Sequence, residues 1–226
     1  MKVTYYGHAC FSAVVGGKIL LFDPFISGNP LAKDVDAKKV PADFILVSHG
    51  HDDHVDDAVE IAKRTNALVI ANFEVAMWLE KQGAPRVHPM NHGGGYNFDF
   101  GRVKLVNAIH SSTMPDGTNG GHPAGFVIES ADGNFYYSGD TALTLDMKLI
   151  GETTPLKFAA LCIGDNFTMG PDDAVKAAEF VRCKEILGVH YDTFPPIKID
   201  HAMAAEKFRA ANKTLHLLQP GETFDF

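Results

Sequence analysis

The sequence predicts an α/β fold in which strands form sheets and helices cover the outer faces of those sheets. Short apolar runs typical of strands precede runs with helical periodicity, and this order, strands and then helices, occurs twice along the chain. A length of 226 residues with 46% hydrophobic content suffices for one large domain but is short for two. No repeat or linker divides the chain, so we expect residues 1–226 to form a single domain.

In the first half, short β-rich runs are followed by two helical patterns. Gly16 and Gly17 predict a hairpin turn between the second and third strands. Helices are predicted over residues 55–62 and 73–82, and Gly83 ends the second of them. The predicted strands are residues 2–6, 11–15, 19–22, 44–47 and 68–71, of which 44–47 is a continuous apolar run typical of a buried central strand.

The second half follows the same logic without repeating the sequence. Pro171 predicts the start of a helix that runs to about Arg182, because proline suits the first helical position and acidic residues follow it in the first turn. Asp200 is a candidate N-cap for a last helix over residues 202–211. The predicted strands are residues 103–109, 125–129, 135–138, 158–163, 186–189 and 215–218.

Charge and composition limit the classes of partner. The formal net charge is −8 and no run of Lys or Arg occurs, so we expect no nucleic-acid partner. No apolar stretch approaches the roughly 20 residues of a membrane span, and we identify no signal peptide, so a cytoplasmic location and no membrane association are expected. The odd cysteine count, Cys10, Cys162 and Cys183, predicts buried free thiols and no disulfide framework.

The run from Ser48 to His54 carries the strongest chemical signal. It directly follows the predicted strand 44–47 and contains His49, His51, Asp53 and His54. In extended backbone His49 and His51 project to the same side and can share one ion, while Asp53 and His54 come where the chain turns into a helix. Imidazole and carboxylate groups are ligands that zinc and similar ions prefer. This spacing predicts a metal site, against the alternative of a solvated polar loop.

Further ligands are expected at the ends of other strands. His110 follows the predicted strand 103–109, Asp140 follows 135–138, and His190 follows 186–189. Each residue alone is better explained as a cap or a surface residue. Because all three follow predicted strands, we expect them to complete the metal site that the His49–His54 run begins.

These residues give the chain a specific resemblance. The His-x-His-x-Asp-His run followed by His110, Asp140 and His190 resembles the metallo-β-lactamase superfamily, and within it the small metal-dependent hydrolases related to L-ascorbate-6-phosphate lactonase. The resemblance covers essentially the whole chain. Its supporting segments are residues 7–10 (GHAC), 22–25 (FDPF), 139–141 (GDT), 164–171 (GDNFTMGP) and 190–195 (HYDTFP).

The resemblance implies a fold, a ligand set and a cofactor. The fold is a four-layer αβ/βα sandwich with the site at one edge. Two divalent ions are implied, Zn²⁺ first and Mn²⁺ or Fe²⁺ as alternatives. His49, His51 and His110 would hold the first ion, and Asp53, His54 and His190 would hold the second. Asp140 would bridge them, whereas true β-lactamases usually lack an aspartate there, which argues against antibiotic hydrolysis.

Several other residues are candidates for supporting roles. The resemblance places His8 near the metals, where it could orient a substrate or protonate a leaving group, and a buried structural histidine is the alternative. Asp23 is a candidate hydrogen-bond partner of a metal-bound histidine, or a turn residue before Pro24. Candidates for contact with ligands or substrate, each with a capping or surface alternative, are Asp165, Asn166 and His122. His92, His122 and Asp192 depart from the pattern of the group.

The expected activity is hydrolysis of a small molecule. Asp53 and Asp140 are the expected catalytic carboxylates, and a hydroxide bridging two ions would attack an ester, lactone or phosphodiester bond. Two alternatives remain, an iron-dependent oxidoreductase on the same scaffold and a non-catalytic metal- or ligand-binding protein. The loop 111–123 is rich in Gly, Thr and Asp and is a candidate for a flexible lid. The resemblance also allows a homo-oligomer.

Overall fold

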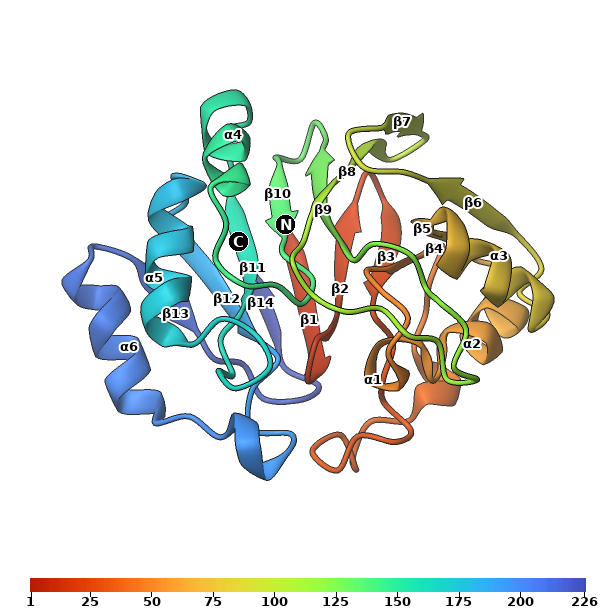
Figure 1. Cartoon of the computed structure of the whole chain (residues 1–226), viewed down its shortest axis with the longest axis horizontal. Coiled ribbons are helices and arrows are strands. Elements are labelled where there is room, and N and C mark those ends of the chain that lie inside the picture. Colours follow the sequence, from red (N-terminus) through yellow and green to blue (C-terminus); the bar gives the residue numbers. More distant parts are fainter.

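Two seven-stranded sheets face each other in the computed structural model, which describes all 226 residues (Figure 1). The first sheet has the strand order β14-β1-β2-β3-β4-β5-β6, and the second has the order β13-β12-β11-β10-β9-β8-β7. The strands of the first sheet are β14 (Thr223–Asp225), β1 (Lys2–Gly7), β2 (Cys10–Val15), β3 (Lys18–Phe22), β4 (Phe44–Val47), β5 (Leu68–Asn72) and β6 (Val87–Met90). Those of the second are β13 (Thr214–His216), β12 (Glu185–Val189), β11 (Phe158–Cys162), β10 (Phe135–Tyr137), β9 (Ala124–Glu129), β8 (Gly101–Asn107) and β7 (Gly95–Phe98).

Both sheets are mixed, and they share one pattern of strand directions. In the first sheet the pairs from β14 to β3 are antiparallel, and the pairs from β3 to β6 are parallel. In the second sheet the pairs from β7 to β10 are antiparallel, and those from β10 to β13 are parallel. The carboxyl ends of the parallel strands in each sheet therefore meet at one edge, where loops can bring polar side chains together.

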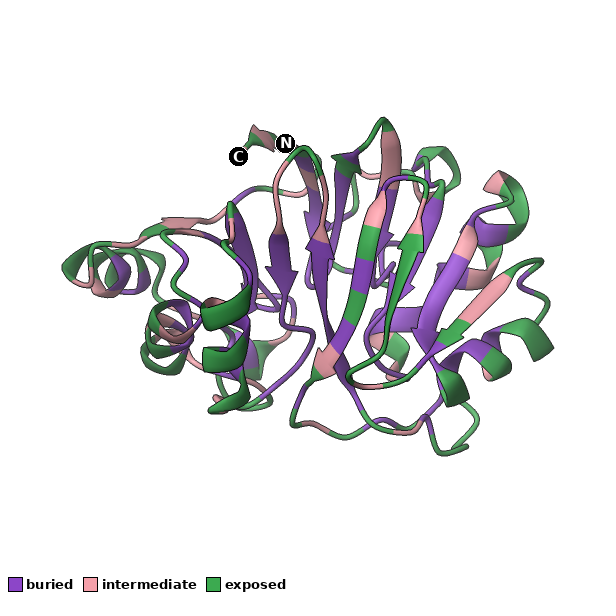
Figure 2. Cartoon of the chain, turned by 90° about the horizontal axis from the view of Figure 1, so that it is seen from above, coloured by how far each residue is buried: buried purple, intermediate pink, exposed green.

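Helices cover the outer faces of both sheets, which gives four layers (Figure 2). The first sheet packs against α2 (Ala58–Thr65) and α3 (Phe73–Lys81), and the second against α5 (Pro171–Phe180) and α6 (His201–Ala210). One buried apolar cluster lies between the two sheets. One further cluster lies between each sheet and the helices that cover it. The predicted α/β class and αβ/βα sandwich are confirmed.

The local sequence explains where the helices begin and end. The side chain of Asp200 accepts a hydrogen bond from the Met203 amide at the start of α6, and Pro171 occupies the first turn of α5. The helical pattern predicted over 55–62 is interrupted between α1 (Asp52–Val55) and α2. The carboxylate of Asp57 there accepts hydrogen bonds from the amides of Ile26 (2.6 Å) and Ser27 (2.9 Å), so it holds the loop after β3.

Three strands and helix α4 were among the elements not predicted. Strand β6 contains a proline and β7 is exposed, so neither shows an apolar strand pattern. Helix α4 (Asp146–Thr153) has only two buried side chains, which leaves little periodicity to recognise. Strand β14 is defined by its antiparallel pairing with β1, more than 200 residues earlier in the chain. The three cysteines are buried and free, as predicted.

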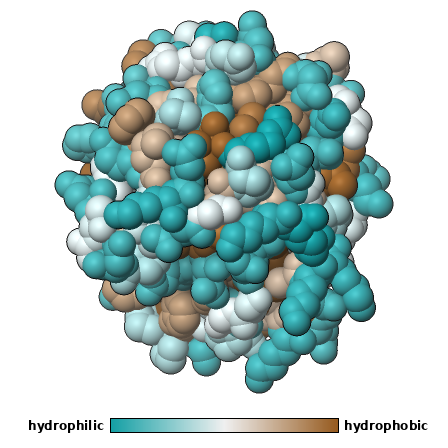
Figure 3. Space-filling view, turned by 90° about the vertical axis from the view of Figure 1, so that its right-hand side faces the viewer, coloured by the Kyte–Doolittle hydropathy of each residue, from teal (hydrophilic) through white to brown (hydrophobic).

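The face of the molecule on the side of α2 and α3 is mainly polar. Figure 3 shows the right-hand side of the view in Figure 1, where hydrophilic side chains predominate and hydrophobic ones form small separate patches. None of the helices combines the length and the apolar character required to cross a membrane. The two chain ends lie close together, because the Met1 amino group donates a hydrogen bond to the Phe226 carbonyl (2.6 Å).

Candidate metal centre

The loop after β4 carries the first histidines of the cluster. His49 is fully buried, and its Nε2 lies 2.9 Å from His51 Nδ1, so both nitrogens face the same point. Gly50 lies between them with its backbone against Met114, and a Cβ at this position would overlap Met114 Sδ. The glycine therefore allows the loop 111–123 to pack directly against the histidine run.

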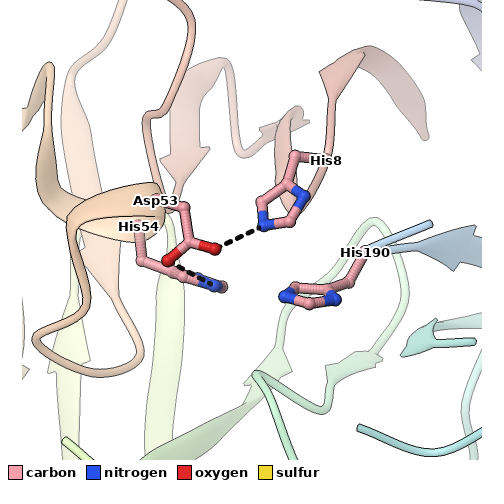
Figure 4. Close-up of side chains that lie close together, drawn as sticks. All are labelled: His8, Asp53, His54 and His190. Carbon is pink, nitrogen blue, oxygen red and sulfur yellow. Dashed lines mark hydrogen bonds and ion pairs between the residues drawn. The ribbon is translucent and has the colours of Figure 1, made fainter. Parts of the chain in front are cut away.

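Two groups of donor atoms are gathered at this edge of the sheets. His49, His51 and His110 bring one ligand atom each to within 4.8 Å of one another. His8, Asp53, His54 and His190 form a second group by the same measure, and Figure 4 shows their side chains converging from three separate segments of the chain.

Asp140 lies between the two groups. Its Oδ2 is 2.9 Å from His190 Nε2 and 3.3 Å from His54 Nε2 on one side. On the other side the same oxygen is 3.7 Å from His110 Nε2 and 3.9 Å from His49 Nε2. All seven residues predicted as ligands are thus in one cluster, with Asp140 central, as a bridging group would be.

Several donor atoms of the cluster have no hydrogen-bond partner within the protein. The protein has five buried side-chain nitrogen or oxygen atoms without a hydrogen-bond partner, and three of them are His54 Nε2, Asp140 Oδ1 and His190 Nδ1. Buried polar atoms are normally paired, so three such atoms in one cluster fit a role as ligands of metal ions. The set of imidazoles and carboxylates suits zinc, manganese or iron.

The electrostatics of the cluster support the same interpretation. Burial raises the pKa of Asp140, but the neighbouring His190 and His54 outweigh burial and hold this pKa well below its usual range. Burial lowers the pKa of His54, but Asp140 and Asp23 outweigh it and raise this pKa well above its usual range. Burial lowers the pKa of His49, so its imidazole is neutral. Asp140 is therefore ionised and His49 neutral, which is the state that a cation requires, whereas a cation bound at His54 would have to displace a proton.

Comparison with known proteins assigns the family. A model of the beta-lactamase superfamily domain matches residues 2–190. The chain belongs to the metallo-β-lactamase superfamily. A protein of Christiangramia forsetii named UPF0173 metal-dependent hydrolase is 53% identical over 226 residues, which is 100% of both chains.

Two solved structures share the fold of this chain. Igni18, described as a novel metallo hydrolase from Ignicoccus hospitalis, matches with a TM-score of 0.89 and 34% identity over 100% of this chain and 98% of that one. An isothiocyanate hydrolase from Delia radicum gut bacteria matches with a TM-score of 0.80 over 100% of this chain and 99% of that one. At 19% identity the second comparison supports the fold alone.

In this superfamily member, Asp23 holds the ring of His54 in position by a hydrogen bond. Its fully buried carboxylate accepts hydrogen bonds from His54 Nδ1 (2.7 Å), the Ser48 amide (2.7 Å) and the Tyr137 hydroxyl (2.6 Å). The bond to Nδ1 leaves His54 Nε2 directed at Asp140, so Asp23 has the position expected for a partner of a metal-bound histidine. Ser48 Oγ donates to Asp23 Oδ2 (2.5 Å) and lies 2.9 Å from His49 Nδ1, so it links Asp23 to His49 in a way that the sequence did not indicate.

His8 contacts Asp53 and is absent from the lining of the pocket. Its side chain is fully buried, with Nε2 3.1 Å from Asp53 Oδ2 and Nδ1 2.9 Å from Thr193 Oγ1. Burial, with a smaller contribution from His190, lowers the pKa of His8 to about 4 despite its bond to Asp53. These contacts fit the alternative of a buried, hydrogen-bonded histidine that holds the Asp53 carboxylate in place, and the role of His8 in orienting a substrate or protonating a leaving group stays a prediction.

A pocket of about 500 Å³ opens over the cluster. It exposes His51, Asp53, His110, Asp140 and His190 to a ligand and extends along the loop 111–123. Its other lining residues are Asp52, Ser111, Thr113, Met114, Pro115, Phe167 and Phe194. The lining thus combines metal-ligand candidates with an apolar wall that the sequence did not reveal.

The other substrate-binding candidates lie outside the lining of this pocket. Asp165 and Asn166 both have positive φ angles (61° and 50°) and form the turn before α5, where Asp165 Oδ1 accepts the Asn166 amide. His122 is exposed, and His92 Nε2 lies 2.8 Å from the Pro123 carbonyl. Asp192 Oδ2 lies 2.6 Å from His201 Nε2. In these positions their contacts are structural.

The loop 111–123 is attached at several points, unlike a free lid. Trp78 Nε1 donates to Asp116 Oδ2 (2.8 Å), and Asn72 Nδ2 donates to the carbonyls of Gly120 and His122 (2.8 Å each). Met114 is buried against Gly50. These contacts fix the wall of the pocket to α3 and to the histidine run.

Proposed function

We propose that the chain is a metal-dependent hydrolase that cleaves an ester, lactone or phosphodiester bond in a small molecule. It holds two divalent cations, for which Zn²⁺ is the leading candidate. The observation that carries the proposal is the cluster itself: His54 Nε2, Asp140 Oδ1 and His190 Nδ1 are buried without partners among further imidazoles and carboxylates. Full-length relatives named metal-dependent hydrolases support it.

The ligands divide between two positions. His49, His51 and His110 would hold one cation, Asp53, His54 and His190 would hold the other, and Asp140 would contact both. Bound cations would supply Lewis acidity, which lowers the pKa of water toward neutrality and polarises the oxygen of the bond to be cleaved.

The side chains of the protein orient the reactants. Asp53 is the carboxylate of the cluster with the greater exposure, 27% of its side chain, and His8 holds its Oδ2. Its Oδ1, which lies 4.0 Å from His54 Nε2, is left free to be the ligand atom beside that imidazole. Asp23 fixes the His54 ring, and Met114 with the loop 111–123 limits the access of bulk water on one side.

Metal analysis with a matched control tests the proposal. Purified protein is expected to carry about two divalent ions per chain and to hydrolyse generic esters, lactones or phosphodiesters until chelator is added. Asp140→Ala and His51→Ala should lose metal and activity while the far-UV circular dichroism is retained. Asp99→Ala, at a side chain 58% exposed and paired with Lys18, should match the wild type.

Three results would contradict the proposal. Activity that persists in excess chelator after dialysis would exclude a metal-dependent reaction. Full metal occupancy and activity in Asp140→Ala would remove the bridging role. A coloured, iron-loaded protein without hydrolytic activity would favour the oxidoreductase alternative, because zinc sites have no visible absorption.

A further inference from the structure

The apolar part of the pocket is built mainly from two phenylalanines on adjacent loops. Phe167 lies between β11 and α5, and Phe194 follows β12, the strand paired with β11. Phe167 is 54% exposed although it lines the pocket over the metal cluster. Exposed aromatic side chains inside a pocket usually contact the apolar part of a ligand.

Phe194 is held in a fixed orientation. Its ring makes an edge contact with His8, at 5.5 Å between ring centroids, and lies 6.4 Å from the ring of Phe25. Because His8 is itself bonded to Asp53, the apolar wall begins directly beside the ligand cluster. A substrate whose reacting bond lies at the cluster would therefore place its nearest substituent against Phe194 and Phe167.

The charged side chains of the lining, apart from histidines, are all carboxylates. They are Asp52, Asp53 and Asp140. Asp53 and Asp140 belong to the proposed ligands, whereas Asp52 is exposed and faces a bound molecule as a free negative charge. The lining has no Arg or Lys, the side chains with which proteins commonly bind a non-reacting phosphate, so no cationic side chain is available to hold one.

We propose that the substrate is a neutral carboxylic ester or lactone whose apolar substituent packs against Phe167 and Phe194, and that the site does not accept a substrate with an additional phosphate. This inference rests on the proposed function. In the reaction the acyl carbon gains the oxygen of water and its bond to the alcohol oxygen breaks. The alcohol oxygen takes one proton of the water, and the carboxylic acid releases the other to solvent.

Binding of product-like carboxylates to metal-loaded protein tests the inference separately from catalysis. Calorimetry would compare acetate, butanoate, hexanoate and octanoate with 6-phosphogluconate, a carboxylate that carries a phosphate. If the alkyl chain of the carboxylate packs against Phe167 and Phe194, the affinity should rise roughly threefold per added methylene group. This increase is somewhat smaller than the one expected for a fully buried methylene group. 6-Phosphogluconate should bind more weakly than hexanoate.

Matched variants locate the effect. Phe167→Ala should reduce the increase per methylene to less than about 1.5-fold, and Phe194→Ala should act in the same direction. Phe73→Ala removes a phenylalanine of nearly equal exposure, 53%, from the start of α3, and should bind the series like the wild type. Because Phe167 is exposed, its replacement leaves the folded core intact.

The outcomes separate the two proposals. Affinity independent of chain length in the wild type, an unchanged increase in Phe167→Ala, or tighter binding of 6-phosphogluconate than of hexanoate would overturn the substrate class. Chain-length dependence that Phe167→Ala abolishes would support it, even if no ester or lactone were hydrolysed. Absence of hydrolysis by metal-loaded protein would instead count against the proposed function.

Discussion

His8 Nε2 lies 3.1 Å from Asp53 Oδ2, while the other nitrogen of the same ring lies 2.9 Å from Thr193 Oγ1. An ionised carboxylate only accepts hydrogen bonds, so Nε2 of the neutral ring carries the proton, and Nδ1 accepts the Thr193 hydroxyl. The Asp53 carboxylate thus selects the tautomer of His8, and the Thr193 hydroxyl, which can donate or accept, is the partner of the other ring nitrogen. Asp53 is ionised, because the hydrogen bond from His8 and the nearby His54 lower its pKa against the opposing effect of burial.

Replacing His8 should weaken metal binding without removing a ligand proposed above. In His8→Ala the Asp53 carboxylate loses its only hydrogen-bond donor from a side chain, and affinity for the more weakly held cation should fall about 10- to 100-fold. His8→Gln retains an N–H donor and should recover most of this loss. Competition with a chromophoric chelator measures both values. Wild-type affinity in His8→Ala would contradict the positioning role.

Thr193 should contribute to stability through its hydroxyl. Thr193→Val leaves the buried His8 Nδ1 without a donor and should lower the free energy of unfolding of metal-free protein by about 1–3 kcal/mol. Thr193→Ser keeps the hydroxyl and should stay within about 0.5 kcal/mol of the wild type. Urea denaturation gives these values. Equal stability of the valine and serine variants would show that the hydroxyl does not pair with His8.

Acid should destabilise the metal-free protein partly through His8. The pKa of His8 is about 4 in the folded protein and 6.5 in its ordinary state, so the unfolded chain binds this proton more readily. Its contribution to stability is therefore complete above pH 6.5 and is lost as the pH falls toward 4. When the pH is lowered from 7 to 4.5, the free energy of unfolding of His8→Gln should fall by about 2 kcal/mol less than that of the wild type. Parallel unfolding curves for the two proteins at both pH values would exclude this contribution.

Gly50 and Met114 should be energetically coupled. A methyl group at Gly50 would overlap Met114 Sδ, so Gly50→Ala should lower the free energy of unfolding by about 1–3 kcal/mol. Met114→Ala in the same chain should relieve the overlap, and the double-mutant cycle should give a coupling of about 1 kcal/mol or more. Denaturation of the four proteins measures it. If the two changes in the free energy of unfolding were strictly additive, the loop 111–123 would be free to move away from position 50.

The ligand cluster was predictable because its residues obey a local rule. His49, Asp140 and His190 each follow a short apolar run, and apolar runs of this kind form the strands whose ends meet in α/β folds. The strands themselves were predicted within a few residues, since β4 and β12 are apolar throughout or nearly so. In such cases local sequence carries both the element and the position of the polar residue after it.

The supporting roles of Thr193 and Tyr137, unlike that of Asp23, were not predictable, because they depend on contacts between distant segments. Thr193 meets His8 across 185 positions of the chain, and Tyr137 meets Asp23 across 114. Nothing beside Thr193 or Tyr137 in the sequence differs from an ordinary strand or turn. Phe167 was equally hidden, since a single phenylalanine in a loop gives no sign of whether it faces solvent, core or pocket.

The two sides of the pocket differ in how they are attached, which determines how its selectivity can change. Met114 is packed against the backbone of Gly50, between two of the metal-ligand histidines, so a new side chain at Met114 would shift the ligands as well. Phe167 is exposed in a loop outside the ligand cluster. Divergence of related enzymes, or their redesign in the laboratory, can therefore alter the accepted substituent at Phe167 and preserve the reaction.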